Sequence, residues 1–257
     1  MSAPQTMPVR AFVFSPTGGT FNATHMLASM FSDAPQMVDQ TDLASRDTAF
    51  TLRPDELVLL AAPSFGGKVP YAPNLFTNLK ANGTPCILVC TYGNRACENN
   101  LAQMYQTATE QGLVVVGAIT LVTPHTLAIR SGHSRPDLGD QLVMREFARK
   151  VCDKLTAGKL VSIPAPEGDP TPSQRKRAKA CIPKHLNQEL CGHCGTCVTG
   201  CPEGAINPDT LEIDEDICIQ CQRCSHICPT GARSYTANWD GVDAKCYAPR
   251  KDVTYLV

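Results

Sequence analysis

The sequence predicts an α/β protein in which a parallel sheet covered by helices is followed by a smaller part organised by cysteines. Up to about residue 160, short apolar runs alternate with segments of helical periodicity. Strands that are apolar on both faces are typical of a parallel sheet with helices on each side. After residue 185, two cysteine runs of matching spacing replace this alternation. The change of pattern predicts two parts with different architectures.

The apolar runs predict strands at residues 9–14, 57–61, 86–91 and 113–122, with a weaker strand at 36–39. Helices are expected at 20–31, 73–80, 99–111 and 140–155. The last helix has the clearest apolar face, made of Leu142, Val143, Phe147, Val151 and Leu155. Gly158 follows as a stop signal. Alternation of this kind predicts strand–helix–strand units.

Length, charge and apolar content restrict the class of protein. A chain of 257 residues can form one large or two modest domains with a buried core. The formal net charge of -1 argues against nucleic acid as a partner. No apolar run approaches the roughly 18 residues of a membrane span, and residues 1–10 do not read as a secretion signal. We therefore expect a cytoplasmic protein whose 14 cysteines are reduced or bound to metal.

The expected domain limits are 1–160 and 185–257, the second including a C-terminal tail. Between them, residues 161–184 contain several prolines and a basic run at 175–179. Prolines stiffen a connection and block regular structure, so this segment is predicted to be a linker. The basic run is interpreted as a solvated surface, with docking to an acidic partner as the alternative.

The cysteine runs are an internal duplication. The first is Cys191-x2-Cys194-x2-Cys197-x3-Cys201-Pro202, and the second is Cys218-x2-Cys221-x2-Cys224-x3-Cys228-Pro229. This spacing is typical of bacterial proteins with two 4Fe–4S clusters, in which the fourth cysteine of each run ligates the other cluster. The sequence therefore predicts two clusters with crossed ligation. One is held by Cys191, Cys194, Cys197 and Cys228, and the other by Cys218, Cys221, Cys224 and Cys201.

Zinc is the alternative metal for clustered cysteines. A structural zinc site pairs two short knuckles and takes four ligands, which does not explain three close cysteines and a Cys-Pro, twice. His193 and His226 lie inside the runs and are expected to tune a cluster rather than to ligate it. Cys181 and Cys246 fall outside the spacing and are not predicted to be ligands.

A Gly/Thr-rich turn joins the first strand to the first helix. Residues 15–20 read Ser-Pro-Thr-Gly-Gly-Thr, which presents backbone N–H groups, hydroxyls and a positive helix end to a phosphate. Asn22 is a further candidate donor. The turn lacks the Gly-Lys-Ser/Thr of a nucleotide triphosphate loop. The absence of Lys and Arg between Val13 and Phe31 favours a tightly bound monophosphate; an ordinary strand–helix turn is the alternative.

Two further loops follow later strands and carry an aromatic residue beside glycine. They are residues 63–70, with Phe65, and residues 91–95, with Tyr92. In an open α/β sheet the loops at the carboxyl ends of the strands gather at the ligand crevice. The two aromatic side chains are therefore candidates to sandwich a flat ring, although simple packing would also explain each of them.

With these motifs, the chain resembles bacterial and archaeal proteins that fuse a flavodoxin-like FMN domain to a two-cluster ferredoxin domain. The resemblance implies an α/β flavodoxin-like fold with a five-stranded parallel sheet of order 2-1-3-4-5, followed by a small α+β bacterial-type ferredoxin domain. It also implies FMN and two 4Fe–4S clusters as cofactors. The residues expected to bind FMN are Ser15, Thr17, Gly18, Gly19, Thr20, Asn22, Pro63, Ser64, Phe65, Gly66, Gly67, Thr91, Tyr92, Gly93 and Asn94.

Three functions are compatible with these motifs. The leading hypothesis is an electron-transfer protein that relays electrons between a redox-protein partner, the clusters and FMN. No general acid–base constellation is evident, so no catalytic residue is assigned. The second hypothesis is an FMN-dependent reductase of a small molecule or protein, for which Cys90, Cys97 and His125 lie in segments that can approach the flavin. The third is a redox sensor that docks through its basic linker. A homodimer is compatible with the sequence, which does not predict the oligomeric state.

Overall fold

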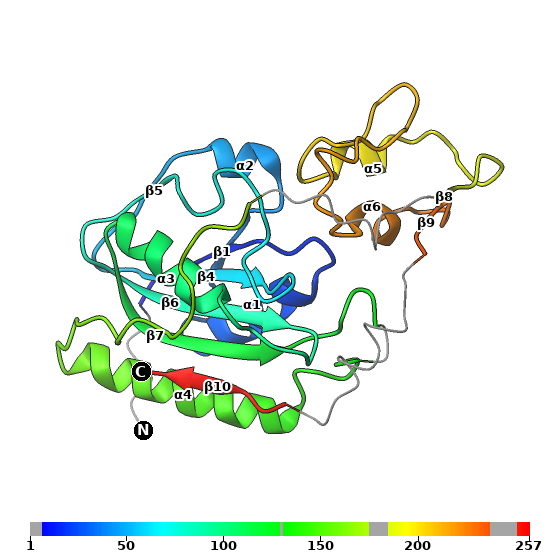
Figure 1. Ribbon diagram of the computed structural model, residues 1–257. Coiled ribbons are helices and arrows are strands. Elements are labelled where there is room, and N and C mark those ends of the chain that lie inside the picture. The colour runs from blue at the N-terminus through cyan, green and yellow to red at the C-terminus, as the bar shows by residue number, and fades with distance from the viewer. Residues whose placement is uncertain (1–6, 129–130, 175–184, 237–250) are drawn as a thin grey trace.

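The computed structural model of the protein describes residues 7–128, 131–174, 185–236 and 251–257 (Figure 1). Its main sheet has six strands in the order β10-β7-β6-β4-β1-β2. The parallel strands are β1 (Val9–Val13), β2 (Gln36–Asp39), β4 (Leu57–Pro63), β6 (Thr84–Tyr92) and β7 (Leu113–Val122). Numbered along the chain, they lie in the order 2-1-3-4-5, as the resemblance implies. The sixth strand, β10 (Thr254–Leu256), was not predicted.

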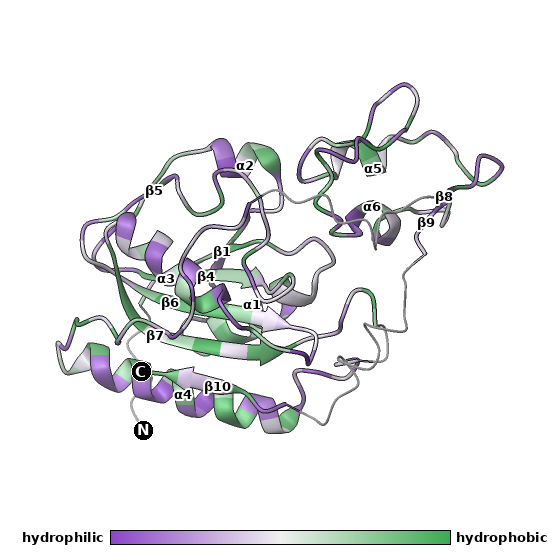
Figure 2. Cartoon of the chain, viewed as in Figure 1, coloured by the Kyte–Doolittle hydropathy of each residue, from purple (hydrophilic) through white to green (hydrophobic). Residues whose placement is uncertain are grey.

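Helices cover both faces of this sheet. α1 (Gly19–Ala28) and α4 (Leu138–Thr156) pack on one face, and α3 (Asn100–Glu110) packs on the other. The central strands are mostly hydrophobic, whereas α4 alternates along its length (Figure 2). Phe147 and Val151 are buried as expected, but Leu142 is exposed. Asp137 caps α4 reciprocally with Asp140, so the helix begins two residues before its predicted start.

The predicted helix at 73–80 is wrong. The segment forms turns and ends in the short strand β5 (Leu79–Lys80), which pairs with β3 (Phe50–Thr51). Asn74 and Phe76 have φ angles of 61° and 62°, which a right-handed helix excludes. The segment packs beside α2 (Leu43–Asp47), where the Asn78 amide donates to the Arg46 carbonyl at 2.5 Å. Tertiary pairing has overridden a helical pattern.

The part of the proline-rich segment that is described, residues 161–174, lies along the first part of the molecule. Ile163 is buried, and its N–H donates to the Val115 carbonyl at 2.8 Å. The Ile163 carbonyl accepts from the Tyr105 hydroxyl at 3.1 Å. The Asp169 N–H donates to Asn99 Oδ1. The basic run at 175–179 lies outside the described residues, and the domain limits at 160 and 185 stay a prediction.

The C-terminal segment returns to the first part. β10 pairs antiparallel with β7, with Tyr255 opposite Ile119. The Tyr255 ring lies 5.5 Å from the Phe147 ring of α4, and Val253 joins the core on that face. The chain segments that precede and follow the second part in the sequence therefore both pack on the first part.

The second part repeats its backbone as well as its cysteines. Its elements are β8 (His185–Leu186), α5 (Thr196–Thr199), α6 (Arg223–His226) and β9 (Arg233–Ser234), with β8 and β9 antiparallel. α5 and α6 occupy equivalent positions in the two cysteine runs. The residues that precede them, Gly195 and Gln222, are both left-handed, with φ angles of 72° and 62°. The duplication inferred from the sequence is thus present in the conformation.

Candidate functional site

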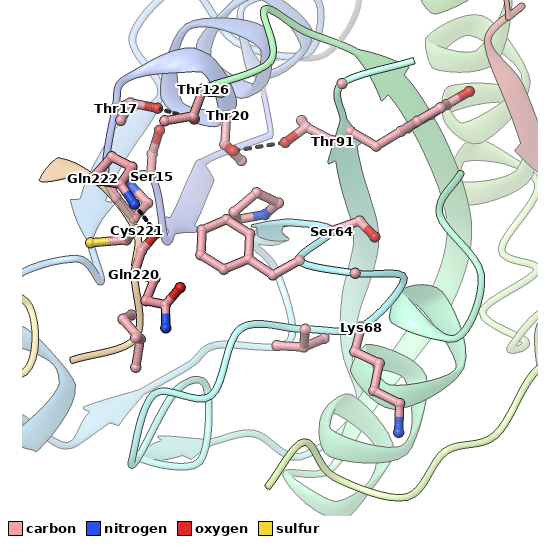
Figure 3. Close-up of a pocket in the computed structure, with 18 of the residues that line it drawn as sticks. Ser15, Thr17, Thr20, Ser64, Lys68, Thr91, Thr126, Gln220, Cys221 and Gln222 are labelled. Atoms are coloured by element: carbon pink, nitrogen blue, oxygen red, sulfur yellow. Dashed lines mark hydrogen bonds between the residues drawn. The ribbon is translucent and has the colours of Figure 1, made fainter. Parts of the chain in front are cut away.

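A cavity of about 760 Å³ lies at the carboxyl edge of the main sheet. The loops after β1, β4, β6 and β7 line it, which is where an open α/β sheet places its ligand crevice. Residues 218–222 of the second part line it too. Figure 3 shows Gln220, Cys221 and Gln222 across the cavity from Ser64 and Thr91. The cavity is therefore walled by both parts of the chain.

The loop after β1 has the form of an anion site. Gly18, at a φ of 86°, turns the chain into α1, and Ser15 Oγ accepts from the Phe21 N–H at 2.9 Å. The Asn22 N–H donates to the Gly18 carbonyl. The first four N–H groups of a helix have no acceptor within it, so those of Gly19 and Thr20, both lining the cavity, can serve a phosphate.

Hydroxyl pairs tie this loop to its neighbours. Thr20 Oγ1 lies 2.7 Å from Thr91 Oγ1 at the end of β6, and Thr17 Oγ1 lies 3.1 Å from Thr126 Oγ1 (Figure 3). All four threonines line the cavity. Each hydroxyl keeps a lone pair or a proton for a ligand while its partner fixes its position. The loop therefore offers neutral donors that are already oriented.

The loop after β4 is a tight turn built on two glycines. Phe65 and Lys68 exchange backbone hydrogen bonds at 2.8 and 3.2 Å, and Gly66 and Gly67 have φ angles of 59° and 87°. Positive φ at both central residues of a turn strongly favours glycine. A Cβ at Gly66 would meet nothing within 4 Å, whereas one at Gly67 would collide with Glu98. Gly66 therefore leaves its backbone accessible at the cavity wall.

Tyr92, expected as a ring beside the flavin, lines the cavity at the end of β6. Burial raises the pKa of its phenol, while the charge of Arg135 and a hydrogen bond with Thr120 oppose that rise. The hydrogen bond with Thr120 ties the phenol to the neighbouring strand β7. Tyr92 contributes to the cavity wall, and its role as a ring that stacks on a ligand stays a prediction.

Most of the other residues expected to bind FMN line this cavity. They are Ser15, Thr17, Gly19, Thr20, Pro63, Ser64, Phe65, Gly66, Thr91 and Gly93. Gly18, Asn22, Gly67 and Asn94 do not line it. Asn94 Oδ1 accepts from the Lys251 N–H at 3.0 Å and so holds the C-terminal segment. Gly67 accepts from the Asn99 N–H at 2.8 Å and supports the turn from behind.

Sequence reasoning placed His125 near the site without assigning it a role. Its Nδ1 accepts from the N–H groups of Leu127 and Ala128 at 3.0 and 2.9 Å. In the neutral ring the proton is therefore on Nε2. The ring lies against Gly93, where an added Cβ would come within 2.1 Å of it. His125 follows β7 at the carboxyl edge of the sheet, and this position in the sequence indicates that it lines the cavity.

The eight cysteines of the runs line two smaller cavities in the second part. One is lined by Cys201, Cys218, Cys221 and Cys224, and the other by Cys191, Cys194, Cys197 and Cys228. Burial raises the pKa of Cys224 to about 11, and burial also raises the pKa of Cys221. Without a metal these thiols keep their protons, and a bound metal would deprotonate them on ligation. His193 and His226, expected only to tune a cluster, are exposed, and Cys181 and Cys246 lie outside the described residues.

Two cysteines connect the large cavity to a small one. Cys218 and Cys221 line both the cavity at the sheet edge and the one that contains Cys201 and Cys224. None of the four cysteines that line the other small cavity contributes to the large cavity. A group held by the set with Cys218 would therefore be the neighbour of a ligand at the sheet edge. A group held by the set with Cys191 would be more remote.

Buried polar contacts join the two parts beside these cavities. Arg46 is fully buried; it forms an ion pair with Glu203 at 2.9 Å and donates to the Pro202 carbonyl. Arg223 donates to the Pro16 carbonyl at 2.9 Å. Tyr235 donates to the Thr126 carbonyl at 2.7 Å. Such contacts hold the second part against α2 and against the loops after β1 and β7.

Comparisons with known proteins were made for the whole chain. Residues 190–232 match the family model described as a 4Fe-4S dicluster domain. That match confirms the prediction of an iron–sulfur domain in the second part. The solution structure of two-electron reduced flavodoxin from Megasphaera elsdenii matches at 18% identity over 56% of this chain and 99% of that one, with a TM-score of 0.36. Among curated protein sequences none matches. Within the described residues no helix has the length and apolarity to cross a membrane.

Proposed function

We propose that this protein transfers electrons between an external redox partner, two 4Fe–4S clusters and FMN. The observation that carries this proposal is the double role of Cys218 and Cys221, which line both the large cavity and a small one. A cluster on these ligands would sit directly beside a cofactor at the sheet edge. Protein-bound clusters carry one electron each, and a neighbouring flavin is a suitable place to combine them.

The large cavity fits FMN in chemistry and in volume. Gly19 and Thr20 offer helix N-terminal N–H groups to the phosphate, and the hydroxyls of Thr17 and Thr91 are oriented beside them. The exposed backbone at Gly66 can hydrogen-bond the edge of the ring. FMN, when bound, accepts two electrons and releases them singly. The remaining wall, which includes Phe65 and His125, would orient the ring and exclude water.

The ligand proposal keeps the crossed arrangement. Each small cavity is lined by the first three cysteines of one run and the fourth cysteine of the other run. Cys201 lies with the second run, and Cys228 lies with the first. We assign the set with Cys218 to the near cluster and the set with Cys191 to the remote cluster. Cys194 of the remote set is exposed, so a partner can approach there. Electrons would then pass between partner, remote cluster, near cluster and flavin.

Cofactor content tests this function. Protein purified without oxygen is expected to contain about eight iron atoms per chain, the content of two 4Fe–4S clusters, and one FMN. A matched control is C152S, because Cys152 lies on α4 outside both runs and should leave both contents unchanged. Protein that retains zinc and no flavin would contradict the proposal.

A reductase is the second candidate, and the extent of the cavity favours it. Beyond the loops expected to bind FMN, the wall includes Val69, Tyr71 and residues 171–174. A cavity this size lies in the upper range for small-ligand sites, so it can admit a substrate beside the cofactor. Turnover of a defined substrate with reduced ferredoxin as donor would establish this activity. The redox-sensor hypothesis depends on the basic run, which lies outside the described residues.

A further inference from the structure

Two cysteines outside the runs meet behind the wall of the large cavity, next to the lining residues Thr91 and Ser64. Cys90 and Cys97 form a disulfide, with Cα atoms 6.8 Å apart. The sequence predicted a buried strand residue and an ordinary loop residue at these positions, each reduced. Disulfides in reducing compartments are usually transient, catalytic or redox-sensing. A disulfide between Cys90 and Cys97 therefore indicates either a redox function or a structural one.

The disulfide closes the loop that forms one wall of the cavity. Cys90 precedes Thr91 at the end of β6, and Gly93 lies within the closed segment; both Thr91 and Gly93 line the cavity. At the other end, the Cys97 carbonyl accepts from the Ser64 hydroxyl at 3.4 Å. Ser64 lines the cavity beside Phe65. The pair thus links two of the loops expected to hold the flavin.

The closed segment has an unfavourable backbone. Within it Asn94 has a φ of 66°, and Glu98, just outside it after Cys97, has a φ of 46°. Left-handed conformations cost free energy in residues other than glycine, least in Asn, and persist only where the surroundings hold them. Ser64 and the Arg95–Glu98 ion pair, at 2.6 Å, contribute to holding the segment. The covalent bond adds to those weak contacts.

The two sulfur atoms differ in access. Cys90 is fully buried in the core on the α3 face, whereas Cys97 is half-buried at the edge of the same core. Ile219 of the second cysteine run packs against this core as well. An outside thiol can therefore reach Cys97 before Cys90, and a change at the pair would be felt close to the near cluster.

We propose that Cys90 and Cys97 are a thiol–disulfide exchange site whose redox state sets the affinity of the cavity for flavin. A thiolate of an external dithiol attacks Cys97 Sγ, the bond between the two sulfurs breaks, and Cys90 leaves as a thiolate that takes up a proton. The second thiol of the dithiol, as a thiolate, resolves the mixed disulfide, so the dithiol is oxidised and Cys97 gains a proton. The inference rests on the proposed function only in naming flavin as the ligand.

Reduction should weaken flavin binding. The disulfide form presents the segment from Thr91 to Cys97 already ordered, whereas the dithiol form must order it on binding. Loss of such pre-organisation is expected to raise the Kd for FMN by about tenfold. The oxidised state is thus the high-affinity state of the cavity.

The experiment measures FMN affinity by fluorescence quenching on flavin-depleted protein with its clusters intact, in anaerobic buffers of reduced and oxidised dithiothreitol, a dithiol, with an increasing share of the reduced form. Differential alkylation with mass spectrometry reports the state of Cys90 and Cys97 in the same samples. Wild type is expected to lose affinity as the pair is reduced. C97S should show the low affinity throughout. C86S, on the same strand, should respond like wild type.

Two results would overturn the inference. One is an unchanged Kd while alkylation records full conversion of the pair; the other is the absence of the disulfide in every buffer. C97S is used in place of a variant at Cys90, because Cys90 is fully buried and C97S leaves the core intact. Absence of flavin binding in all states would instead refute the proposed function, because alkylation still reports the pair without flavin.

Discussion

Arg46 and Glu203 form a buried ion pair where the two parts of the chain meet. Their buried ion pair lies beside the cavity of the near cysteine set, which Glu203 helps to line. The reduction potential of a cluster depends on nearby charge and on hydrogen bonds. A positive charge favours the reduced, more negative cluster, and a carboxylate disfavours it. The two side chains should therefore shift the near cluster in opposite directions.

We expect R46Q to lower the near cluster's reduction potential and E203Q to raise it. Each shift should be about 59 mV, which corresponds to a tenfold change in a one-electron equilibrium. An anaerobic redox titration followed by EPR measures both. E56Q is the control, because Glu56 forms a comparable ion pair with Arg10 next to β1 and β4, outside the cavities. Shifts of the same sign in R46Q and E203Q would indicate a purely structural role.

The double-glycine turn gives a second residue-scale prediction. G66A places a methyl group in open space at the cavity wall, so it should weaken FMN binding and cost roughly 1 kcal/mol of stability for its left-handed backbone. G67A should cost more, because its Cβ would collide with Glu98. Flavin fluorescence and urea unfolding separate the two effects. Equal stability losses in G66A and G67A would contradict this account of the turn.

Residue types predicted the site better than they predicted side-chain directions. Glycine and hydroxyl residues after β1 and β4 line the cavity because their backbone position fixes them there. Tyr92 also sits at the expected position, and its phenol forms a hydrogen bond with Thr120 on the neighbouring strand, which the loop sequence did not indicate. Sequence spacing gives the order of residues along a loop, and packing decides which side an aromatic ring takes.

At the scale of elements, β10 gives a test of how the C-terminal segment is held. Tyr255 contacts Phe147, and its hydroxyl bonds to Glu146 and Lys150 at 3.0 and 2.8 Å. Y255A should therefore destabilise the first part by about 2 kcal/mol through loss of partly buried aromatic area. L256A is the control, because Leu256 is largely exposed. Chemical unfolding with equal losses for both variants would argue against the strand pairing.

Elements with strong periodicity could be predicted, and those made by long-range pairing could not. The long strands and α4 follow from apolar runs in the sequence. Residues 73–80 have a helical pattern but pair as β5 with β3, which lies far back along the chain. β10 is three residues long and joins the sheet through β7. Neither pairing leaves a local signal.

At the scale of the whole molecule, the proposed route of electrons depends on the contact between the two parts. The cysteine spacing predicted two sets of four cysteines, which line two separate cavities, and the loop motifs predicted a cavity at the sheet edge. Their proximity could not be predicted, because it depends on contacts such as those of Arg46 and Arg223 between distant segments. That proximity makes the set with Cys218 the near one.

Crossed ligation and relay order can be tested together with C201A and C228A. C201A should disable the near cluster and C228A the remote one, since these cysteines line different cavities. Both variants should retain flavin, because neither cysteine lines the large cavity. Uncrossed ligation would exchange the two outcomes.

The most direct measurement is rapid mixing of each variant with reduced ferredoxin under anaerobic conditions, with cluster and flavin bleaching followed by absorbance. In C228A, the flavin should still be reduced through the remaining near cluster. In C201A, the remote cluster should bleach while the flavin stays oxidised on that timescale. Flavin reduction in C201A at the wild-type rate would contradict the proposed relay.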